Sequence, residues 1–151
     1  MIKVIHPIAG ALALLMISSF WLSTAFVELF AGAPIVVMVK QLIPWGFTAL
    51  IPAIVIAGLS GNALGKKWRN PIVGRKRRRM PIIAANGIVI LIPAALYLSA
   101  KAQAGQFDTG FYVVQLLELV AGSVNITLLG LSMRDGLGLS GRVRPGSLHS
   151  E

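Results

Sequence analysis

Four long apolar stretches, separated by more polar segments, dominate the sequence. They cover about residues 7–29, 42–64, 82–100 and 111–133. A helix needs roughly 20 apolar residues to cross a hydrocarbon core about 30 Å thick, and each stretch reaches about that length. Membrane-crossing strands are about ten residues long and alternate in polarity, which these stretches do not. The pattern therefore predicts an all-α protein, a four-transmembrane-helix bundle with up-down-up-down topology.

The apolar stretches also define the expected domain organisation. We expect residues 1–133 to form the four-helix transmembrane domain, with a long basic cytoplasmic loop at 62–79. Residues 134–151 are rich in Gly, Ser and Arg and poor in apolar residues, which is typical of a flexible tail. Pro52 and Pro93 fall in the middle of predicted helices, where a missing N–H predicts a kink.

The basic residues are distributed unevenly along the chain. Of fourteen Lys and Arg residues, twelve lie on the side that holds the long loop, Lys3 and the C-terminal tail, whereas Lys40 and Lys101 lie on the other side. Cytoplasmic loops carry the excess of Lys and Arg, so both termini are predicted to be cytoplasmic (N-in/C-in). The loop supplies eight of the twelve charges: Lys66, Lys67, Arg69, Arg75, Lys76, Arg77, Arg78 and Arg79.

The composition narrows the class of protein further. Charged residues make up 13% of the chain and hydrophobic residues 56%, which excludes an ordinary water-soluble globule. The chain has no cysteine, which excludes disulfides and thiolate metal sites. The basic loop is expected to contact the anionic headgroups of membrane lipids, not nucleic acid. No catalytic or nucleotide-binding motif is present, so nothing here indicates an enzyme.

Ionisable and amide side chains inside the apolar stretches are the candidate site residues. Gln115, Glu118, Gly122 and Asn125 follow three-four-three spacing, which places them on one helix face that we expect to point inward. Such groups are costly in hydrocarbon, so each is a candidate for a ligand or proton site.

One further acidic residue and one basic residue lie at a similar depth in the bundle to Glu118. Glu28 ends the first apolar stretch and Lys40 precedes the second, so a Glu28–Lys40–Glu118 cluster is geometrically allowed. Asn86 and Asn125 lie in the predicted cytoplasmic halves of the third and fourth helices, where their side chains are able to hydrogen-bond across the bundle. Structural hydrogen bonding between helices is the alternative interpretation for all of these residues.

His6 is the one histidine at a depth suitable for a cofactor. A transmembrane haem b normally needs two axial ligands, and one chain supplies His6 with Met16 or Met80 as weaker partners. No cofactor is predicted outright, and haem b at His6 is kept as an alternative. No spacing of His, Asp and Glu predicts a metal site.

Three segments together carry a resemblance to a known group of proteins. They are His6 to Gly10 (HPIAG), Arg79 to Gly87 (RMP followed by ANG), and Glu118 to Gly136 with its closing RDG. The chain resembles a family of small, functionally uncharacterised four-helix proteins of the bacterial inner membrane. The resemblance implies a multi-pass inner-membrane location and no particular activity.

Three hypotheses for function follow from the sequence. The first is a non-enzymatic membrane subunit or scaffold that packs against a larger membrane complex or forms a homo-oligomer. The second is a small proton-coupled transporter or channel component that uses Glu118. The third is a haem- or quinone-binding redox membrane protein that uses His6.

Overall fold

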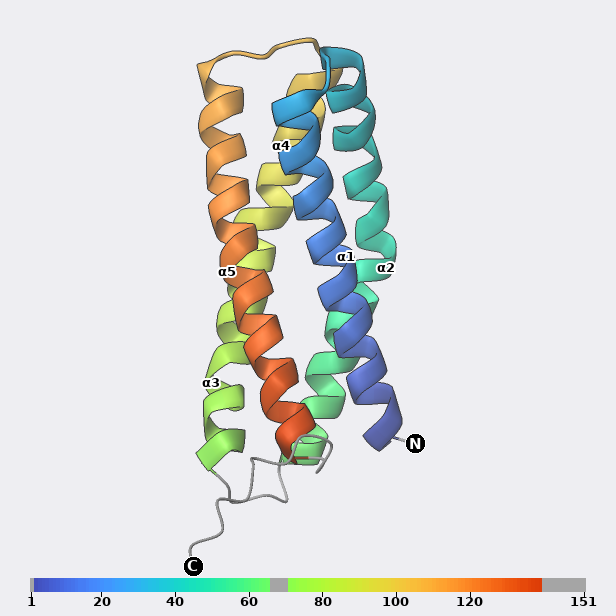
Figure 1. Ribbon diagram of the computed structural model, residues 1–151, viewed down its shortest axis with the longest axis vertical. Coiled ribbons are helices and arrows are strands. Elements are labelled where there is room, and N and C mark those ends of the chain that lie inside the picture. The colour runs from blue at the N-terminus through green and yellow to red at the C-terminus, as the bar shows by residue number, and fades with distance from the viewer. Residues whose placement is uncertain (1, 66–70, 140–151) are drawn as a thin grey trace, which may run out of the picture.

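The computed structural model describes the backbone of residues 2–65 and 71–139, and these residues are almost entirely helical. The elements are α1 (Ile2–Phe30), α2 (Ala33–Gly65), α3 (Pro71–Asn86), the π-helical turn η1 (Gly87–Leu91), α4 (Ile92–Gln103) and α5 (Thr109–Leu139). Because α3, η1 and α4 follow one another without a break, they form one rod, and the described chain is a bundle of four rods (Figure 1).

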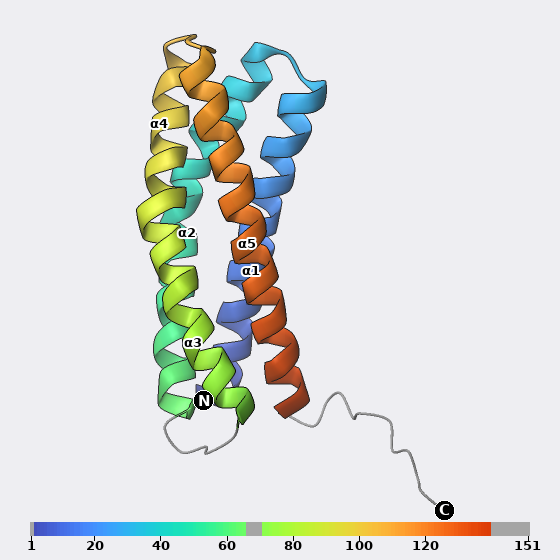
Figure 2. The same ribbon diagram turned by 90° about the vertical axis from the view of Figure 1, so that its left-hand side faces the viewer.

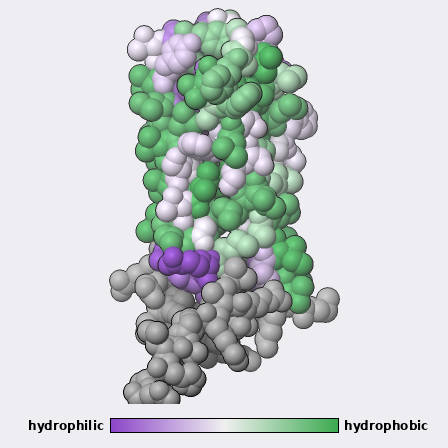
Figure 3. All heavy atoms as spheres, in the orientation of Figure 1, coloured by the Kyte–Doolittle hydropathy of each residue, from purple (hydrophilic) through white to green (hydrophobic). Residues whose placement is uncertain are grey.

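Each rod contains a segment long and apolar enough to cross a membrane: Val4–Phe30, Ala33–Ala63, Arg79–Gln103 and Thr109–Gly136. This confirms the prediction of an all-helical membrane protein with four candidate spans. Large apolar side chains such as Leu22, Phe26 and Trp45 are exposed on the outside of the bundle, where lipid chains solvate them. On the face shown in Figure 3, hydrophobic side chains cover much of the middle and hydrophilic ones lie toward the two ends.

The two short connections, between α1 and α2 and between α4 and α5, lie at the same end of the bundle (Figures 1 and 2). We call this the loop end, and the opposite end, where α1 begins and α5 finishes, the terminal end. Around the bundle, α1 packs most extensively on α2, and α5 lies against α1 and against the α3–α4 rod. Helix α2 contacts α4 well but α3 hardly at all, so the two rods diverge toward the terminal end.

Helix α2 begins at Ala33, nine residues earlier than the predicted 42–64 helix. The carbonyl of Gly32 accepts the first backbone hydrogen bonds, and Pro34 suits the first turn because its missing N–H is not needed there. The sequence placed Lys40 at the start of this helix, with an earlier turn from about Ile35 as the alternative. In the structure Lys40 lies inside the helix, because its ammonium is paired with another helix.

The predicted basic loop 62–79 is also shorter than expected, because α2 continues to Gly65 and α3 begins at Pro71. Residues 66–70 lie outside the described residues. Likewise α5 continues to Leu139, so the first part of the predicted tail 134–151 is helical, and residues 140–151 lie outside the described residues.

The third rod widens into a π-helical turn at η1, directly before Pro93. A proline ring clashes with the carbonyl four residues earlier and supplies no N–H, and a π-helical turn accommodates both effects. The structure therefore has a π-helical turn at the position where the sequence predicted a kink at Pro93.

Two groups of buried apolar residues form the core. One lies near the loop end and contains Val27, Val36, Leu98, Ala102 and Phe111. The other lies further toward the terminal end and contains Ala13, Ile17, Leu50, Ala53, Ile83 and Leu129. The polar residues described next lie beside the loop-end group.

Candidate functional site

A buried ion pair joins α2 to α5 inside the membrane-spanning part of the bundle. The Lys40 Nζ donates a hydrogen bond of 2.7 Å to Glu118 Oε2. The Lys40 side chain is 1% exposed and the Glu118 side chain 13%. A pair this deep is costly to assemble, since both ions lose their hydration, and costly to break, since either ion alone would lack a counter-charge.

Glu28 and Gln115 belong to the same region. The Glu28 carboxyl is attracted by Lys40 and repelled by Glu118. Gln115 is 4% exposed and lies one helical turn before Glu118 on the same face of α5. Within the described residues, Glu28 Oε1 and both amide atoms of Gln115 are buried without a hydrogen-bond partner. We call Glu28, Lys40, Gln115 and Glu118 the loop-end polar cluster.

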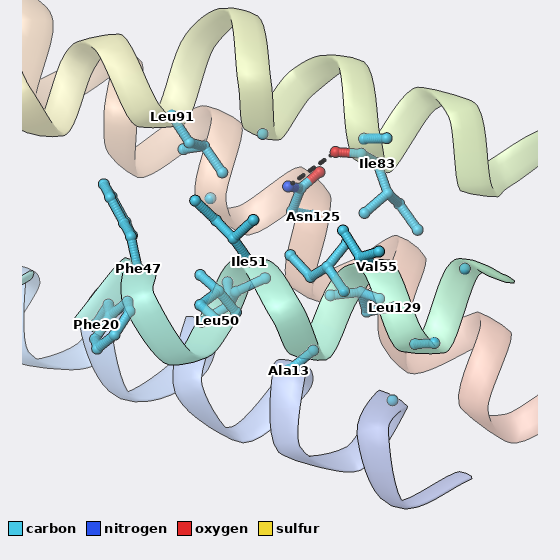
Figure 4. Close-up of a pocket in the computed structure, with 18 of the residues that line it drawn as sticks. Ala13, Phe20, Phe47, Leu50, Ile51, Val55, Ile83, Leu91, Asn125 and Leu129 are labelled. Atoms are coloured by element: carbon cyan, nitrogen blue, oxygen red, sulfur yellow. Dashed lines mark hydrogen bonds between the residues drawn. The ribbon is translucent and has the colours of Figure 1, made fainter. Parts of the chain in front are cut away.

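Asn86 and Asn125 form a separate contact between α3 and α5. Asn86 Nδ2 donates to the carbonyl of Ala121 (2.8 Å) and to Asn125 Oδ1 (2.9 Å). Asn125 is 1% exposed, and its Nδ2 donates to the carbonyl of Ile83 at 3.4 Å (Figure 4). Because both Nδ2 groups and Asn125 Oδ1 are hydrogen-bonded within the protein, this pair fits the role of interhelical hydrogen bonding.

His6 links α1 to α2 near the terminal end. Its Nδ1 lies 3.0 Å from the carbonyl oxygen of Ala57 and 3.2 Å from Ser60 Oγ. A carbonyl accepts hydrogen bonds only, so the contact with Ala57 favours a proton on Nδ1. Gly61 permits this approach, because a Cβ at that position would lie 2.9 Å from His6 Cε1.

A cavity of about 650 Å³ runs between the helices. Its walls are formed mainly by apolar side chains from every rod of the bundle, among them Phe47, Leu50 and Leu91, which Figure 4 shows converging on the space. His6 lines the cavity toward the terminal end, and Thr24 and Glu118 line it toward the loop end. His6 and Thr24 are both on α1, so at 1.5 Å per residue the cavity extends for about 27 Å.

The cavity is not closed on the side between α2 and the α3–η1 segment. Ile51, Val55 and Leu59 of α2 and Ile88 of η1 line the cavity, and their side chains are 45%, 49%, 69% and 66% exposed. This is where α2 and α3 diverge. The cavity is therefore least covered by the bundle on this side.

Trp21 and Gly122 shape the cavity wall close to Glu118. The Trp21 Nε1 donates to the carbonyl of Leu119 at 2.8 Å. A Cβ on Gly122 would lie 2.8 Å from Trp21 Cδ1, so only glycine lets the indole lie against α5 in this position. Sequence reasoning placed Gly122 on the inward face but did not identify Trp21 as its partner. Ser132, which also lines the cavity, was missed altogether.

Two more ion pairs lie near the ends of the bundle. Arg79 donates to Asp135 Oδ2 at 2.8 Å, joining α3 to α5. Lys101 donates to Asp108 Oδ2 at 2.6 Å, and Asp108 Oδ1 accepts the N–H of Phe111 at the start of α5. The Lys101 ammonium and this N–H hold the pKa of the exposed Asp108 carboxyl below its ordinary value.

The predicted lipid-contacting cations are described only at Arg79. Lys66, Lys67 and Arg69 lie outside the described residues, and so do the side chains of Arg75, Lys76, Arg77 and Arg78. Among the residues that the structure describes, no three His, Asp or Glu side chains are grouped as a metal site would require. No protein-family model, curated protein or solved structure matches the chain.

Proposed function

We propose that this protein is a non-enzymatic integral membrane protein that takes the apolar chain of a membrane amphiphile into the space between its helices. The observation that carries the proposal is the elongated cavity of about 650 Å³, with apolar walls and a less covered side between α2 and α3. Binding cavities for small molecules are mostly apolar, contain a few polar groups, and measure roughly 300–1,000 Å³.

The shape of the cavity favours a linear chain over a partner helix. A volume of about 650 Å³ spread over about 27 Å corresponds to a channel about 8 Å wide, once the radius of a water molecule is added on each side. A helix with its side chains is about 10 Å across and has a cross-section of roughly 80 Å². A hydrocarbon chain, whose carbons approach one another to about 4 Å, is narrow enough to fit.

The proposed orientation has both termini in the cytoplasm of a bacterium and the four spans crossing its inner membrane up-down-up-down. Its support is the charge asymmetry, with twelve Lys and Arg residues on the side of the termini and the basic loop against two on the other. The loop end, with Lys40 and Lys101, would then face the periplasm.

The other functions inferred from the sequence stay as predictions with their own tests. His6 lines the cavity together with Met80, which favours a second candidate, a haem b or quinone held at that end. An absorption spectrum of the purified protein would show the Soret band of haem, and an organic extract would contain quinone. A role as a subunit of a larger complex or as a homo-oligomer predicts a native mass above that of one chain.

Fluorescence quenching of Trp21 tests chain binding directly, because Trp21 lines the cavity. Trp45 is 73% exposed to lipid, so it and Trp68 are first replaced by phenylalanine. A brominated long-chain alcohol is then titrated into the protein in detergent. We expect saturable quenching of Trp21.

The matched variants are Gly58→Leu and Gly130→Leu. At both glycines the position that a Cβ would take has no neighbouring side chain within 4 Å, but Gly58 lines the cavity and Gly130 does not. We expect Gly58→Leu to abolish the saturable component by filling the cavity, and Gly130→Leu to retain it. Equal quenching in both variants would mean that the bromine atoms reach Trp21 from the bulk micelle, which would overturn the proposal.

A further inference from the structure

We infer that the loop-end polar cluster binds the head of this chain molecule, and that the head is a hydrogen-bond donor, a hydroxyl or an amine, and not a carboxylate or phosphate. This inference rests on the proposed function and specifies the class of ligand. It is built from the position of the cluster at one end of the cavity, its formal charge and its unpartnered buried amide.

Glu118 is the member of the cluster that lines the cavity. Its Oε2 accepts the hydrogen bond of Lys40, but a carboxylate offers about four acceptor sites, so acceptor capacity is left for a second donor. Thr24, which is buried on α1, lines the same end of the cavity. A ligand head that reaches this end therefore meets a carboxylate that still has hydrogen bonds to accept.

The charges of the cluster select against anionic heads. Glu28 and Glu118 against Lys40 give a formal charge of −1, with Lys40 and Glu118 largely buried and Glu28 half-buried. A ligand carboxylate about 5 Å from an uncompensated negative charge, at an effective dielectric of about 20, would bind roughly 100-fold more weakly than the matching alcohol. An amine would be attracted by the same charge.

Gln115 lies beside the residues that line the cavity, and it is the member of the cluster whose amide is left unpaired. Phe111, Gln115 and Glu118 lie on one face of α5. Phe111 belongs to the buried group that contains Val27 and Val36, and Glu118 pairs with Lys40, one turn beyond Val36. The Gln115 amide lies between these two contacts and therefore faces the cluster. It is 4% exposed and has no hydrogen-bond partner among the described residues, although buried amides are normally paired.

The test uses the protein whose only tryptophan is Trp21 and four brominated chains of equal length. Their heads are a hydroxyl, an amine, a methyl ester and a carboxylate. We expect the alcohol and the amine to bind at least 10-fold more tightly than the methyl ester, which has no donor, and roughly 100-fold more tightly than the carboxylate. The readout is the dissociation constant from saturable quenching.

The variants separate the head site from the rest of the cavity. Glu118→Gln removes the cavity-facing charge and leaves Lys40 with Glu28, so the formal charge of the cluster becomes zero. The double variant Lys40→Met with Glu118→Gln keeps Glu28 alone and a formal charge of −1. We therefore expect Glu118→Gln to lower the preference for alcohol over carboxylate below 10-fold and the double variant to keep most of it, while the methyl ester binds as before in both. Asn86→Ala is the control, because Asn86 bonds elsewhere in the bundle, and it should keep the full preference.

The outcomes distinguish this inference from the proposed function. If all four chains bind with equal affinity, or the carboxylate binds most tightly, the head site is refuted although the cavity still accepts chains. If Glu118→Gln retains the 100-fold preference, the loop-end polar cluster is not its source. If no chain binds, the proposed function fails together with the inference.

Discussion

Replacing Lys40 by methionine would remove the ammonium that pairs with the Glu118 carboxylate and attracts the Glu28 carboxyl group. Breaking a buried ion pair by deleting one partner costs about 3–5 kcal/mol. Because Lys40→Met leaves both carboxyls without a cation, we expect a loss of about 5 kcal/mol. Glu118→Gln leaves Lys40 with Glu28 as a remaining counter-charge, so we expect a loss nearer about 3 kcal/mol.

The double variant Lys40→Met with Glu118→Gln tests whether these costs come from the pair. Neutral side chains of similar size replace a buried pair at little cost, so we expect the double variant to lose at most about 2 kcal/mol, well below the sum of the single losses. The control is Arg79→Gln. Arg79 pairs with Asp135, but both side chains are more accessible than Lys40, and we expect a loss under about 1 kcal/mol.

The measurement is the free energy of unfolding in mixed micelles, from titration with dodecyl sulfate followed by circular dichroism. A loss of about 3 kcal/mol lowers the folding equilibrium constant more than 100-fold, which such a titration resolves. Single-variant losses below about 1 kcal/mol, or a double variant as unstable as the sum of the two, would refute the assignment of Lys40 and Glu118 as a coupled buried pair.

Two other predictions concern packing and pH. Gly122→Ala should push the Trp21 indole away from α5, lower the free energy of unfolding by about 1–3 kcal/mol and shift the fluorescence emission of Trp21. The control is Gly130→Ala on the same helix, which has open space around it and should be neutral or slightly stabilising. Equal stability of the two variants would contradict this prediction. The pKa of the Asp108 carboxyl lies below its ordinary value of 3.8, because Lys101 donates a hydrogen bond to it. The Asp108 carboxylate therefore stabilises the fold above the pKa of the unfolded chain, and this contribution is lost as the pH falls through the pKa of the folded chain. The stability difference between the wild type and Asp108→Asn should therefore shrink between about pH 6 and about pH 2, and a constant difference would show that the carboxylate charge is not involved.

The loop-end polar cluster would explain how the proposed cavity selects its ligand. An entirely apolar cavity would accept any lipid chain that entered from the bilayer, whereas a charged end restricts the chain by its head. The buried pair also fixes the distance between α2 and α5 at this end, while α2 and α3 stay apart at the other. The polar contacts of the cavity therefore lie near the loop end, and its less covered side lies where α2 and α3 diverge.

The sequence by itself determined that the chain is a helical membrane protein with four candidate spans. A backbone in hydrocarbon must satisfy its own hydrogen bonds, so apolar runs of about 20 residues have helix as their available structure. The spacing of Gln115, Glu118, Gly122 and Asn125 also placed these residues on one face, and in the structure that face is turned toward the bundle interior. Helix limits were less predictable, because Lys40 was expected at the start of a helix and lies within it.

Only the tertiary structure decided which side chains meet and where the bundle is hollow. In a membrane protein the faces toward lipid and toward the core are both apolar, so the sequence carries little information on how each helix is rotated. The pairing of Lys40 with Glu118, 78 residues apart, depends on that rotation and on the relative height of α2 and α5. The cavity depends further on the divergence of α2 from α3, a property of helix packing that no local pattern encodes.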